Sequence, residues 1–258
     1  MEDIKQNIEL LLSNIKILHK ESIFSKNKVP KLVAVSKKQE ANKIDQAILY
    51  GQKIFGENRV QEAANRWQKR LEIHKGLELR LIGPLQTNKV KQSLNLFDVI
   101  ETIDRDKIAI EIAKNLHDKT KTKNFYIQIN TGNEPQKSGV DPLDADKFIK
   151  YCIDDLNLPI VGLMCIPPVN EEPSMHFLLL QKIANRNNLS ELSMGMSSDY
   201  EDAIKFGATS VRIGSLLFGE RKGWLEKMTW FVGFCFKIFS IMFVCCYFNR
   251  HSFYNIYP

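Results

Sequence analysis

The sequence lacks the short motifs that mark several large enzyme classes. It contains no G-x-x-x-x-G-K-[ST] loop for nucleotide phosphates, no H-E-x-x-H zinc motif and no G-x-S-x-G nucleophile turn. The nearest match to the last motif, Gly195-Met196-Ser197-Ser198-Asp199, has no closing glycine. The 5 histidines are scattered, and none falls at the end of an expected strand. We therefore expect neither metal catalysis nor a Ser-His triad.

Cysteine is scarce and shows no pairing pattern. The 5 cysteines include no C-x-x-C spacing and no histidine partners at zinc-finger distances, and their number is odd. This usage indicates a reduced compartment, and we expect a cytoplasmic protein. A basic stripe interleaved with aromatic residues is also missing, so the net charge of +6 does not imply nucleic acid as a partner. The N-terminal residues have helical apolar spacing and no signal-peptide core, which predicts an amphipathic helix.

Short apolar runs recur along the chain, with helical patterns between most of them. The runs predict strands at residues 31–36, 53–58, 79–84, 99–104, 125–130, 160–167, 191–197 and 210–219. Helical patterns cover residues 40–50, 59–70, 105–118, 142–156, 174–187 and 199–206, and glycines at 51 and 207 follow the first and last. Such alternation predicts parallel pairing and a single closed (β/α)8 TIM barrel. A doubly wound open sheet is the alternative, but no Gly-rich dinucleotide motif follows the first strand.

The first expected strand leads directly into two lysines, in the segment KLVAVSKK. Ligands of a (β/α)8 barrel gather at the C-terminal ends of the strands, where Lys37 and Lys38 lie. Side chains alternate along a strand, so Lys37 shares a face with Val33 and Val35, and Lys38 shares the other face. Both faces are largely apolar, so alternation does not decide which lysine points inward. A desolvated lysine there could attack an aldehyde, whereas the simpler interpretation is a lysine that extends to water.

A second group of small and polar residues follows the last two expected strands. The tetrad Ser198-Asp199-Tyr200-Glu201 matches a capping box, which predicts that a helix begins there. Gly214 and Ser215 end the last strand, and loops after strands seven and eight are the usual phosphate site of this fold. The alternative is that these glycines are only turn and cap residues. Arg212 shares a face with Gly214 and needs an acceptor if that face lines the barrel interior.

Seven segments, taken in order, resemble one known family. They are AVSKK, FGENRVQE, LIGPLQTNK, the stretch from IQIN to KSGV, GLMCIPP, LSMGMSSD and VRIGSLLFG. Together, from Lys31 to Arg221, they resemble the YggS/PROSC family of pyridoxal phosphate homeostasis proteins. The resemblance implies a barrel like the N-terminal domain of alanine racemase, without the second, β-rich domain of that enzyme. It implies a pyridoxal phosphate (PLP)-binding barrel at residues 1–222, followed by an extension at residues 223–258.

The resemblance also implies roles for individual residues. The first lysine after AVS, here Lys37, forms the internal aldimine with pyridoxal 5′-phosphate. The arginine of VRIG, here Arg212, faces the pyridine nitrogen. Further residues are expected beside the cofactor or around its phosphate: Asn58, Ser193, Gly195, Met196, Ser197, Gly214 and Ser215.

An arginine at the ring nitrogen implies weak carbanion chemistry. A carboxylate there would keep the nitrogen protonated and make the ring a strong electron sink, whereas an arginine only donates hydrogen bonds. Racemases of this fold tolerate such an arginine, but they add a second acid/base group from another domain across the cofactor. We therefore expect a protein that stores PLP and delivers it, with PLP-dependent apoenzymes as candidate recipients and without substantial amino-acid turnover. The alternatives are a PLP-dependent amino-acid racemase that uses Lys37 and, more distantly, a Schiff-base aldolase without a cofactor.

One position departs from the family pattern. The family usually has a histidine in the third strand, before the [FL]-I-G motif, where this chain has Arg80. Arg80 shares a face with Ile82, so a guanidinium inside the barrel would add charge near the cofactor. The sequence alone leaves its effect on cofactor affinity open.

The resemblance ends near Arg221, and the remaining residues are strongly apolar. Residues 229–248 are interrupted only by Lys237 and are long enough to span a bilayer. A central lysine costs about 2.5 to 3.5 kcal/mol on insertion scales and each Phe, Ile or Val returns about 0.3 to 0.6 kcal/mol, so insertion is feasible but marginal. Three interpretations stand: translated non-coding sequence after a lost stop codon or frameshift, a membrane anchor, or an extra helix on the barrel.

Overall fold

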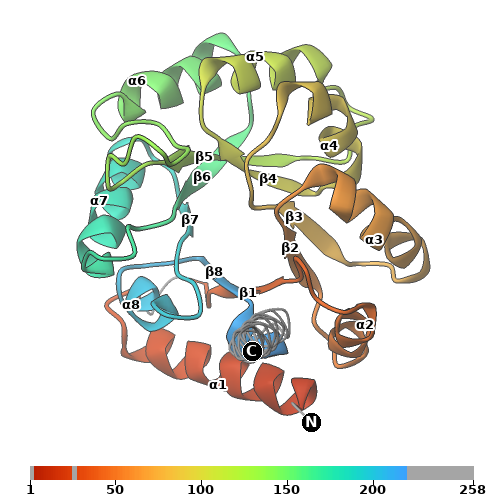
Figure 1. Cartoon of the computed structure of the whole chain (residues 1–258). Coiled ribbons are helices and arrows are strands. Elements are labelled where there is room, and N and C mark those ends of the chain that lie inside the picture. Colours follow the sequence, from red (N-terminus) through yellow and green to blue (C-terminus); the bar gives the residue numbers. More distant parts are fainter. Residues whose placement is uncertain (1–2, 25–27, 220–258) are drawn as a thin grey trace, which may run out of the picture. The chain divides into compact units, whose positions relative to one another are not determined.

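Eight parallel strands close into a barrel in the computed structural model of the chain, and helices surround them (Figure 1). The structure describes residues 3–24 and 28–219. Each strand pairs with the next along the chain, and β8 closes the barrel against β1. The predicted (β/α)8 barrel is confirmed. Its strands are β1 (Lys31–Val35), β2 (Ile54–Glu57), β3 (Glu78–Leu81), β4 (Val99–Ile103), β5 (Asn124–Ile129), β6 (Ile160–Cys165), β7 (Glu191–Ser193) and β8 (Ser210–Ile213).

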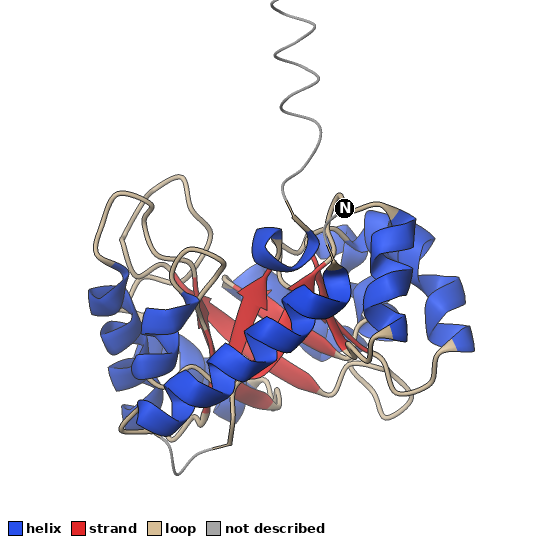
Figure 2. Cartoon of the chain, turned by 90° about the horizontal axis from the view of Figure 1, so that it is seen from below, coloured by secondary structure: helices blue, strands red, loops and turns tan. Residues whose placement is uncertain are grey.

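Helices follow the strands and form the outer layer, which Figure 2 shows from the side. The predicted ends of two helices are confirmed, because Gly51 and Gly207 follow them with φ of 90° and 91°, a left-handed conformation that favours glycine. A π-helical turn, Tyr151–Asp155, continues α6. The helices are α1 (Ile4–Glu21), α2 (Ala41–Leu49), α3 (Val60–Ile73), α4 (Val90–Leu96), α5 (Asp106–Asn115), α6 (Ala145–Lys150), α7 (Pro173–Arg186), α8 (Tyr200–Lys205) and α9 (Ser215–Phe218).

Two elements differ from the sequence prediction. The expected strand at residues 210–219 is wrong in its second half, because β8 ends at Ile213 and residues 215–218 form α9. An apolar run of this length suits a buried strand or a buried helix equally well, and here Leu217 and Phe218 are buried in the outer core. The second difference is α4, because no helix was predicted at residues 90–96. A 3₁₀ turn at Thr87–Lys89 precedes this helix.

The N-terminal amphipathic helix is confirmed as α1. The carboxylate of Asp3 caps it by accepting hydrogen bonds from the amides of Lys5 and Gln6, at 3.0 and 3.3 Å. The helix packs against α8 and α9, and the Asn7 side chain donates a hydrogen bond to the carbonyl of Leu217 at 3.1 Å. Because α8 and α9 flank the last strand, α1 supports the part of the barrel that follows β7 and β8.

The two faces of the strands pack into different surroundings. Leu32 and Ala34 of β1 belong to the large core between the strands and the helices. The alternate face lines the barrel interior: a Cβ placed on Gly56 would lie 3.2 Å from Val33 Cγ1 and 2.8 Å from Ile82 Cδ1. The face of β1 that carries Val33 is therefore the interior face, which alternation alone did not decide.

The extension expected at residues 223–258, with the candidate membrane segment at residues 229–248, lies outside the described residues. Within the described part of the chain, no helix combines the length and the apolar character needed to cross a membrane.

We predict that Gly162→Ala will destabilise the barrel strongly. Gly162 pairs with Glu191 of β7, and an added Cβ would lie 2.0 Å from the carbonyl oxygen of Glu191, a backbone atom that cannot swing aside. We expect a loss of about 3 kcal/mol in the free energy of unfolding, measured by urea denaturation. Gly214→Ala is the control, because its Cβ would lie 3.5 Å from Val35 Cβ, an ordinary contact, and it should cost about 1 kcal/mol or less. Equal losses in the two variants would contradict this.

Candidate functional site

The two lysines after β1 lie in a tight turn at the C-terminal end of the barrel. Lys37 is half-buried, whereas Lys38 is exposed and has a φ of 59°, in the left-handed region. Just before them, Ser36 is fully buried and its amide donates to the carbonyl of Gly56 at 3.1 Å, which continues the β1–β2 pairing. Lys37 is thus the more enclosed of the two lysines, in accordance with its predicted role, which stays a prediction.

A buried carboxylate fixes this turn to its neighbours. Glu57 ends β2 with no exposed surface, and its Oε1 accepts hydrogen bonds from Ser36 Oγ at 2.7 Å, Arg66 Nη1 at 2.8 Å and Trp67 Nε1 at 3.0 Å. Arg66 also donates to the carbonyl of Ser36 at 3.1 Å. The residue that precedes Lys37 is therefore held by β2 and α3 together. Glu57 is not among the residues predicted from the sequence, although a charged residue in an apolar run, with an arginine and a tryptophan on the next helix, was a signal.

Asn58 follows Glu57 and offers an acceptor at the same end of the barrel. Its Oδ1 is buried and has no hydrogen-bond partner within residues 3–24 and 28–219. Gly83, after β3, packs so closely on Asn58 that an added Cβ would lie 2.3 Å from the Asn58 carbonyl oxygen, and Thr102 Oγ1 donates to the Gly83 carbonyl at 2.8 Å. Buried acceptors are normally satisfied, so an amide oxygen held in this position suits a donor on a ligand.

The loop after β7 lies against the end of β8. Ser197 Oγ accepts a hydrogen bond from the amide of Gly214 at 3.3 Å, so the two expected phosphate segments meet. Gly195 has a φ of 90°, and a Cβ there would lie 2.6 Å from Ala203 Cβ, so the loop lies tightly against α8. Ser215 is exposed and is the first residue of α9. Small side chains and the amides of a helix N-terminus together suit a phosphate.

The capping box expected at Ser198 is wrong. The N-cap of α8 is Asp199, and its side chain does not cap that helix. Instead its Oδ1 accepts a hydrogen bond from the amide of Met196 at 2.5 Å, which fixes the loop that precedes the helix. Burial raises the pKa of Asp199, and the hydrogen bond from Met196 opposes that rise. The Met196 amide, expected near the cofactor phosphate, thus already has an acceptor inside the protein.

Arg212 lies inside the barrel with 4% of its surface exposed. Its Nη1 donates to Ser193 Oγ at 2.7 Å and its Nη2 donates to the carbonyl of Cys165 at 2.7 Å. The guanidinium therefore bridges β8 to β7 and β6. Ser193, expected beside the cofactor, is fully buried and donates its own proton to Glu101 Oε2 at 2.6 Å. An arginine that faces the interior needs a hydrogen-bond acceptor, and Ser193 Oγ and the Cys165 carbonyl both serve Arg212 as acceptors.

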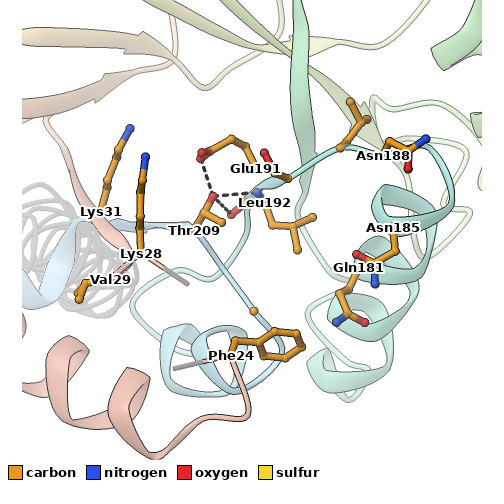
Figure 3. Close-up of a pocket in the computed structure, with 13 residues that line it drawn as sticks. Phe24, Lys28, Val29, Lys31, Gln181, Asn185, Asn188, Glu191, Leu192 and Thr209 are labelled. Atoms are coloured by element: carbon orange, nitrogen blue, oxygen red, sulfur yellow. Dashed lines mark hydrogen bonds between the residues drawn. The ribbon is translucent and has the colours of Figure 1, made fainter. Parts of the chain in front are cut away.

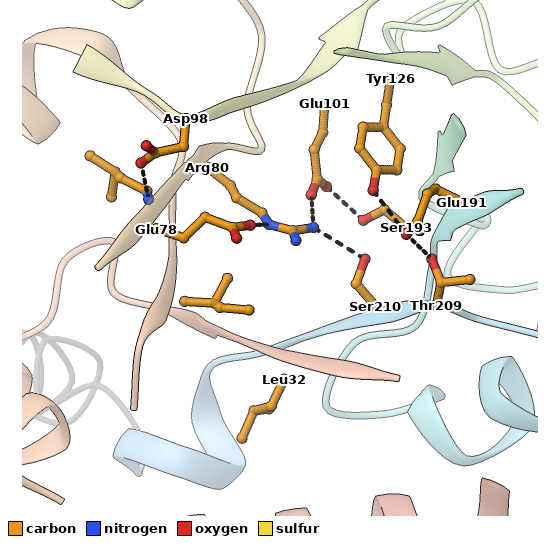
Figure 4. A network of polar contacts seen from close by, with 12 residues as sticks. Leu32, Glu78, Arg80, Asp98, Glu101, Tyr126, Glu191, Ser193, Thr209 and Ser210 are labelled. Carbon is orange, nitrogen blue, oxygen red and sulfur yellow. Dashed lines mark hydrogen bonds and ion pairs between the residues drawn. The ribbon is translucent and has the colours of Figure 1, made fainter. Parts of the chain in front are cut away.

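Arg80, the departure from the family pattern, is also inside the barrel, with 1% of its surface exposed (Figure 4). Its Nε donates to Glu78 Oε1 at 2.6 Å, and its Nη1 donates to Glu101 Oε1 at 2.9 Å and to Ser210 Oγ at 3.4 Å. Desolvation alone would lower the pKa of Arg80, but attraction to Glu101 and Glu78 raises it above the usual value. The positive charge of Arg80 is therefore balanced where it lies.

A cavity of about 670 Å³ lies at the opposite ends of the strands (Figure 3). Its lining includes Lys31, Glu191 and Thr209, which lie at the starts of β1, β7 and β8, together with Phe24 and Lys28. None of the residues expected to bind a cofactor lines it. In the described residues, no group of three or more His, Cys, Asp or Glu side chains is arranged to hold a metal ion. The candidate site is therefore the rim that carries Lys37, Asn58 and the loops after β7 and β8.

Comparisons with known proteins agree on one family. Residues 7–222 match the family model for the N-terminal domain of alanine racemase. A pyridoxal phosphate homeostasis protein of Aquifex aeolicus is 38% identical over 201 residues, which cover 74% of this chain and 87% of that protein. Another, from Vibrio cholerae, is 36% identical over 231 residues, which cover 86% of this chain and 98% of that protein.

Solved structures extend the likeness to three dimensions. The structure of PipY from Synechococcus elongatus with PLP bound has a TM-score of 0.72 and 30% identity, and the match covers 84% of this chain and 100% of that one. An alanine racemase of Corynebacterium glutamicum, with a TM-score of 0.58 and 16% identity, is matched over 84% of this chain and 61% of its own length. At that identity the second likeness concerns the fold alone.

We predict that Glu57→Gln will lower the free energy of unfolding by about 2 kcal/mol, because it leaves the Arg66 guanidinium without a charged acceptor. Asp45→Asn is the matched control: Asp45 pairs with Arg70 at 2.6 Å, but its side chain is 54% exposed, so we expect a loss of about 1 kcal/mol or less. Urea denaturation of both variants measures the difference. If Glu57→Gln were no more costly than Asp45→Asn, Glu57 would not hold the Lys37 turn in place.

Proposed function

The chain belongs to the family of pyridoxal phosphate homeostasis proteins, and its residues 7–222 match the model for the N-terminal domain of alanine racemase. We propose that it binds PLP at the rim of the barrel for storage and delivery. The proposal includes a covalent link between the cofactor and Lys37. The relative with PLP bound, PipY, supports the choice of ligand, since it covers 84% of this chain at 30% identity.

The single observation that carries the proposal is the convergence of complementary groups at one rim. Lys37 supplies a half-buried amine, and Asn58 supplies a buried acceptor without a partner in the described residues. The joined loops at Ser197 and Gly214 supply small residues beside a helix N-terminus. An aldehyde, a polar ring substituent and a phosphate are the groups that these three elements would bind.

Lys37 would hold the cofactor reversibly. Its amine would bind the cofactor aldehyde as a Schiff base with loss of water; water would restore the aldehyde, and a competing amine would displace Lys37. An exchange of this kind suits a protein that takes up PLP and later gives it to an apoenzyme. We infer that PLP-dependent apoenzymes are the recipients. We also infer a cytoplasmic location, because Cys152 and Cys165 are free thiols, as a reducing compartment would keep them.

The contacts of Arg212 favour a protein that holds the cofactor over an enzyme that turns over amino acids. Its two bonds, to Ser193 and to the Cys165 carbonyl, fix the guanidinium in the interior. A guanidinium stays protonated and only donates, so a pyridine nitrogen that faces it remains an acceptor. A ring with an unprotonated nitrogen is a weak sink for the electrons of a carbanion, which disfavours racemisation.

We predict that the purified protein will be yellow with PLP and that Lys37→Ala will abolish this absorbance. Lys38→Ala is the matched control, since Lys38 is the adjacent lysine but is exposed. Reduction with borohydride followed by peptide mapping should place the modification on Lys37 in the wild type and in Lys38→Ala. A colourless wild-type protein after incubation with PLP would refute cofactor binding, and modification of Lys38 would refute the choice of lysine.

We further predict no appreciable racemisation or transamination by the PLP-loaded protein, because Arg212 leaves the ring a weak electron sink. Chiral analysis of amino acids after prolonged incubation measures the first activity, and formation of the keto acid measures the second. The loaded protein should nevertheless restore activity to a PLP-dependent apoenzyme, whereas loaded Lys37→Ala, passed through a desalting column, should not. Appreciable turnover of amino acids would contradict the storage and delivery role.

A further inference from the structure

The contacts of Glu101 inside the barrel form an unbroken chain to Arg212. Glu101, in the middle of β4, has no exposed surface. One carboxylate oxygen, Oε2, accepts from Ser193 Oγ at 2.6 Å, and Ser193 Oγ in turn accepts from Arg212 Nη1 at 2.7 Å. The distances are those of short, charge-assisted hydrogen bonds. A carboxylate on one side of the interior is thus connected through one hydroxyl to a guanidinium on the other.

The chemistry of these groups fixes the direction of each bond. A guanidinium only donates, so Ser193 Oγ must accept from Arg212, and the single hydroxyl proton of Ser193 must go to another acceptor. Glu101 Oε2, at 2.6 Å, is that acceptor. If Glu101 were replaced by a side chain that presents a donor, two donors would compete for the Ser193 oxygen, and the bond to Arg212 would weaken.

Arg80 compensates the buried carboxylate of Glu101. A carboxylate without exposed surface is costly unless a positive group compensates it, and Arg80 Nη1 lies 2.9 Å from Glu101 Oε1. The remaining charge of Arg80 is shared with Glu78, whose Oε1 lies 2.6 Å from Arg80 Nε. The residue that departs from the family pattern is therefore directly bonded to the carboxylate that supports Arg212.

We propose that Glu101 is a positioning residue for Arg212, acting through the Ser193 hydroxyl, and that Arg80 is its charge partner in this role. The proposal rests on the proposed function, in which Arg212 faces the ring nitrogen of PLP. It assigns to the Arg80–Glu101 pair the orientation of that guanidinium, although neither residue would contact the cofactor. It also gives the guanidinium in the third strand a charge partner inside the barrel, since Glu101 Oε1 lies 2.9 Å from Arg80 Nη1.

The test compares Glu101→Gln, Ser193→Ala and the double variant in the full-length protein. Glu191→Gln is the matched control. Glu191 is the first residue of β7 and accepts hydrogen bonds from Thr209 and Tyr126, and among the described residues it has no bond to Ser193 or Arg212. The first readout needs no cofactor. It is the side-chain Nε–H resonance of Arg212 in ¹⁵N-arginine-labelled apoprotein, assigned by its loss in Arg212→Lys.

We expect Glu101→Gln and Ser193→Ala each to shift the Arg212 resonance, the double variant to shift it no further than the larger single change, and Glu191→Gln to leave it in place. Residues that act through one chain of contacts are not additive, whereas independent residues are. Ser193→Ala removes no charge, so it tests the chain of contacts even if Glu101→Gln folds poorly. An unchanged Arg212 resonance in both single variants would overturn the proposal.

The second readout uses the PLP-loaded protein. We expect Glu101→Gln and Ser193→Ala to move the absorbance maximum and to speed PLP release by about tenfold, again without adding in the double variant, while Glu191→Gln behaves as the wild type. Unchanged absorbance and release, with a shifted Arg212 resonance, would overturn the role toward the cofactor. A wild-type protein that binds no PLP would refute the proposed function, and the resonance of the apoprotein would still decide whether Glu101 positions Arg212.

Discussion

The pairing of buried charge is the interaction on which the barrel interior depends. Two guanidinium groups, Arg80 and Arg212, lie within a closed barrel, where an uncompensated charge carries a large desolvation penalty. Glu101 bonds directly to the first and, through Ser193, to the second. The bonds join β3, β4, β7 and β8 across the interior, so the charges cannot be changed one at a time without leaving a buried partner unmatched.

A second buried carboxylate has a corresponding role on the other side of the rim. Glu57 accepts hydrogen bonds from Ser36, Arg66 and Trp67, and it thereby sets the turn that carries Lys37. The lysine and the arginine that would act on a cofactor are thus each held by a carboxylate one contact away. Neither carboxylate lies in the predicted set of ligand-binding residues, because the periodicity of a sequence identifies the faces of strands but not the contacts between them.

A sequence pattern predicts which face of a strand is buried but not which side chains meet across strands, and this difference limits how much of the structure was predictable. The barrel was predictable because alternation of strands and helices is local in sequence, and α9 was missed because an apolar run such as that ending at Phe218 suits either a strand or a helix. Alternation left Lys37 and Lys38 equivalent, and only the cross-strand packing of Val33 against Gly56 and Ile82 identifies the interior face. The acceptor of the Met196 amide was not predictable either, since a capping pattern does not reveal that Asp199 bonds upstream of its helix.

The position of Glu101 also bears on the proposed role in PLP storage and delivery. Strong electron withdrawal by a pyridine ring needs an acid or a carboxylate at the ring nitrogen, and the barrel does contain a buried carboxylate. Both of its oxygens, however, are taken, Oε1 by Arg80 and Oε2 by Ser193, and Arg212 is bonded to Ser193 in turn. The carboxylate therefore acts on the arginine and not on a ligand. A guanidinium fixed in this way presents only donors, so under the proposed function the ring nitrogen that faces it would accept a hydrogen bond and the cofactor would remain a weak electron sink.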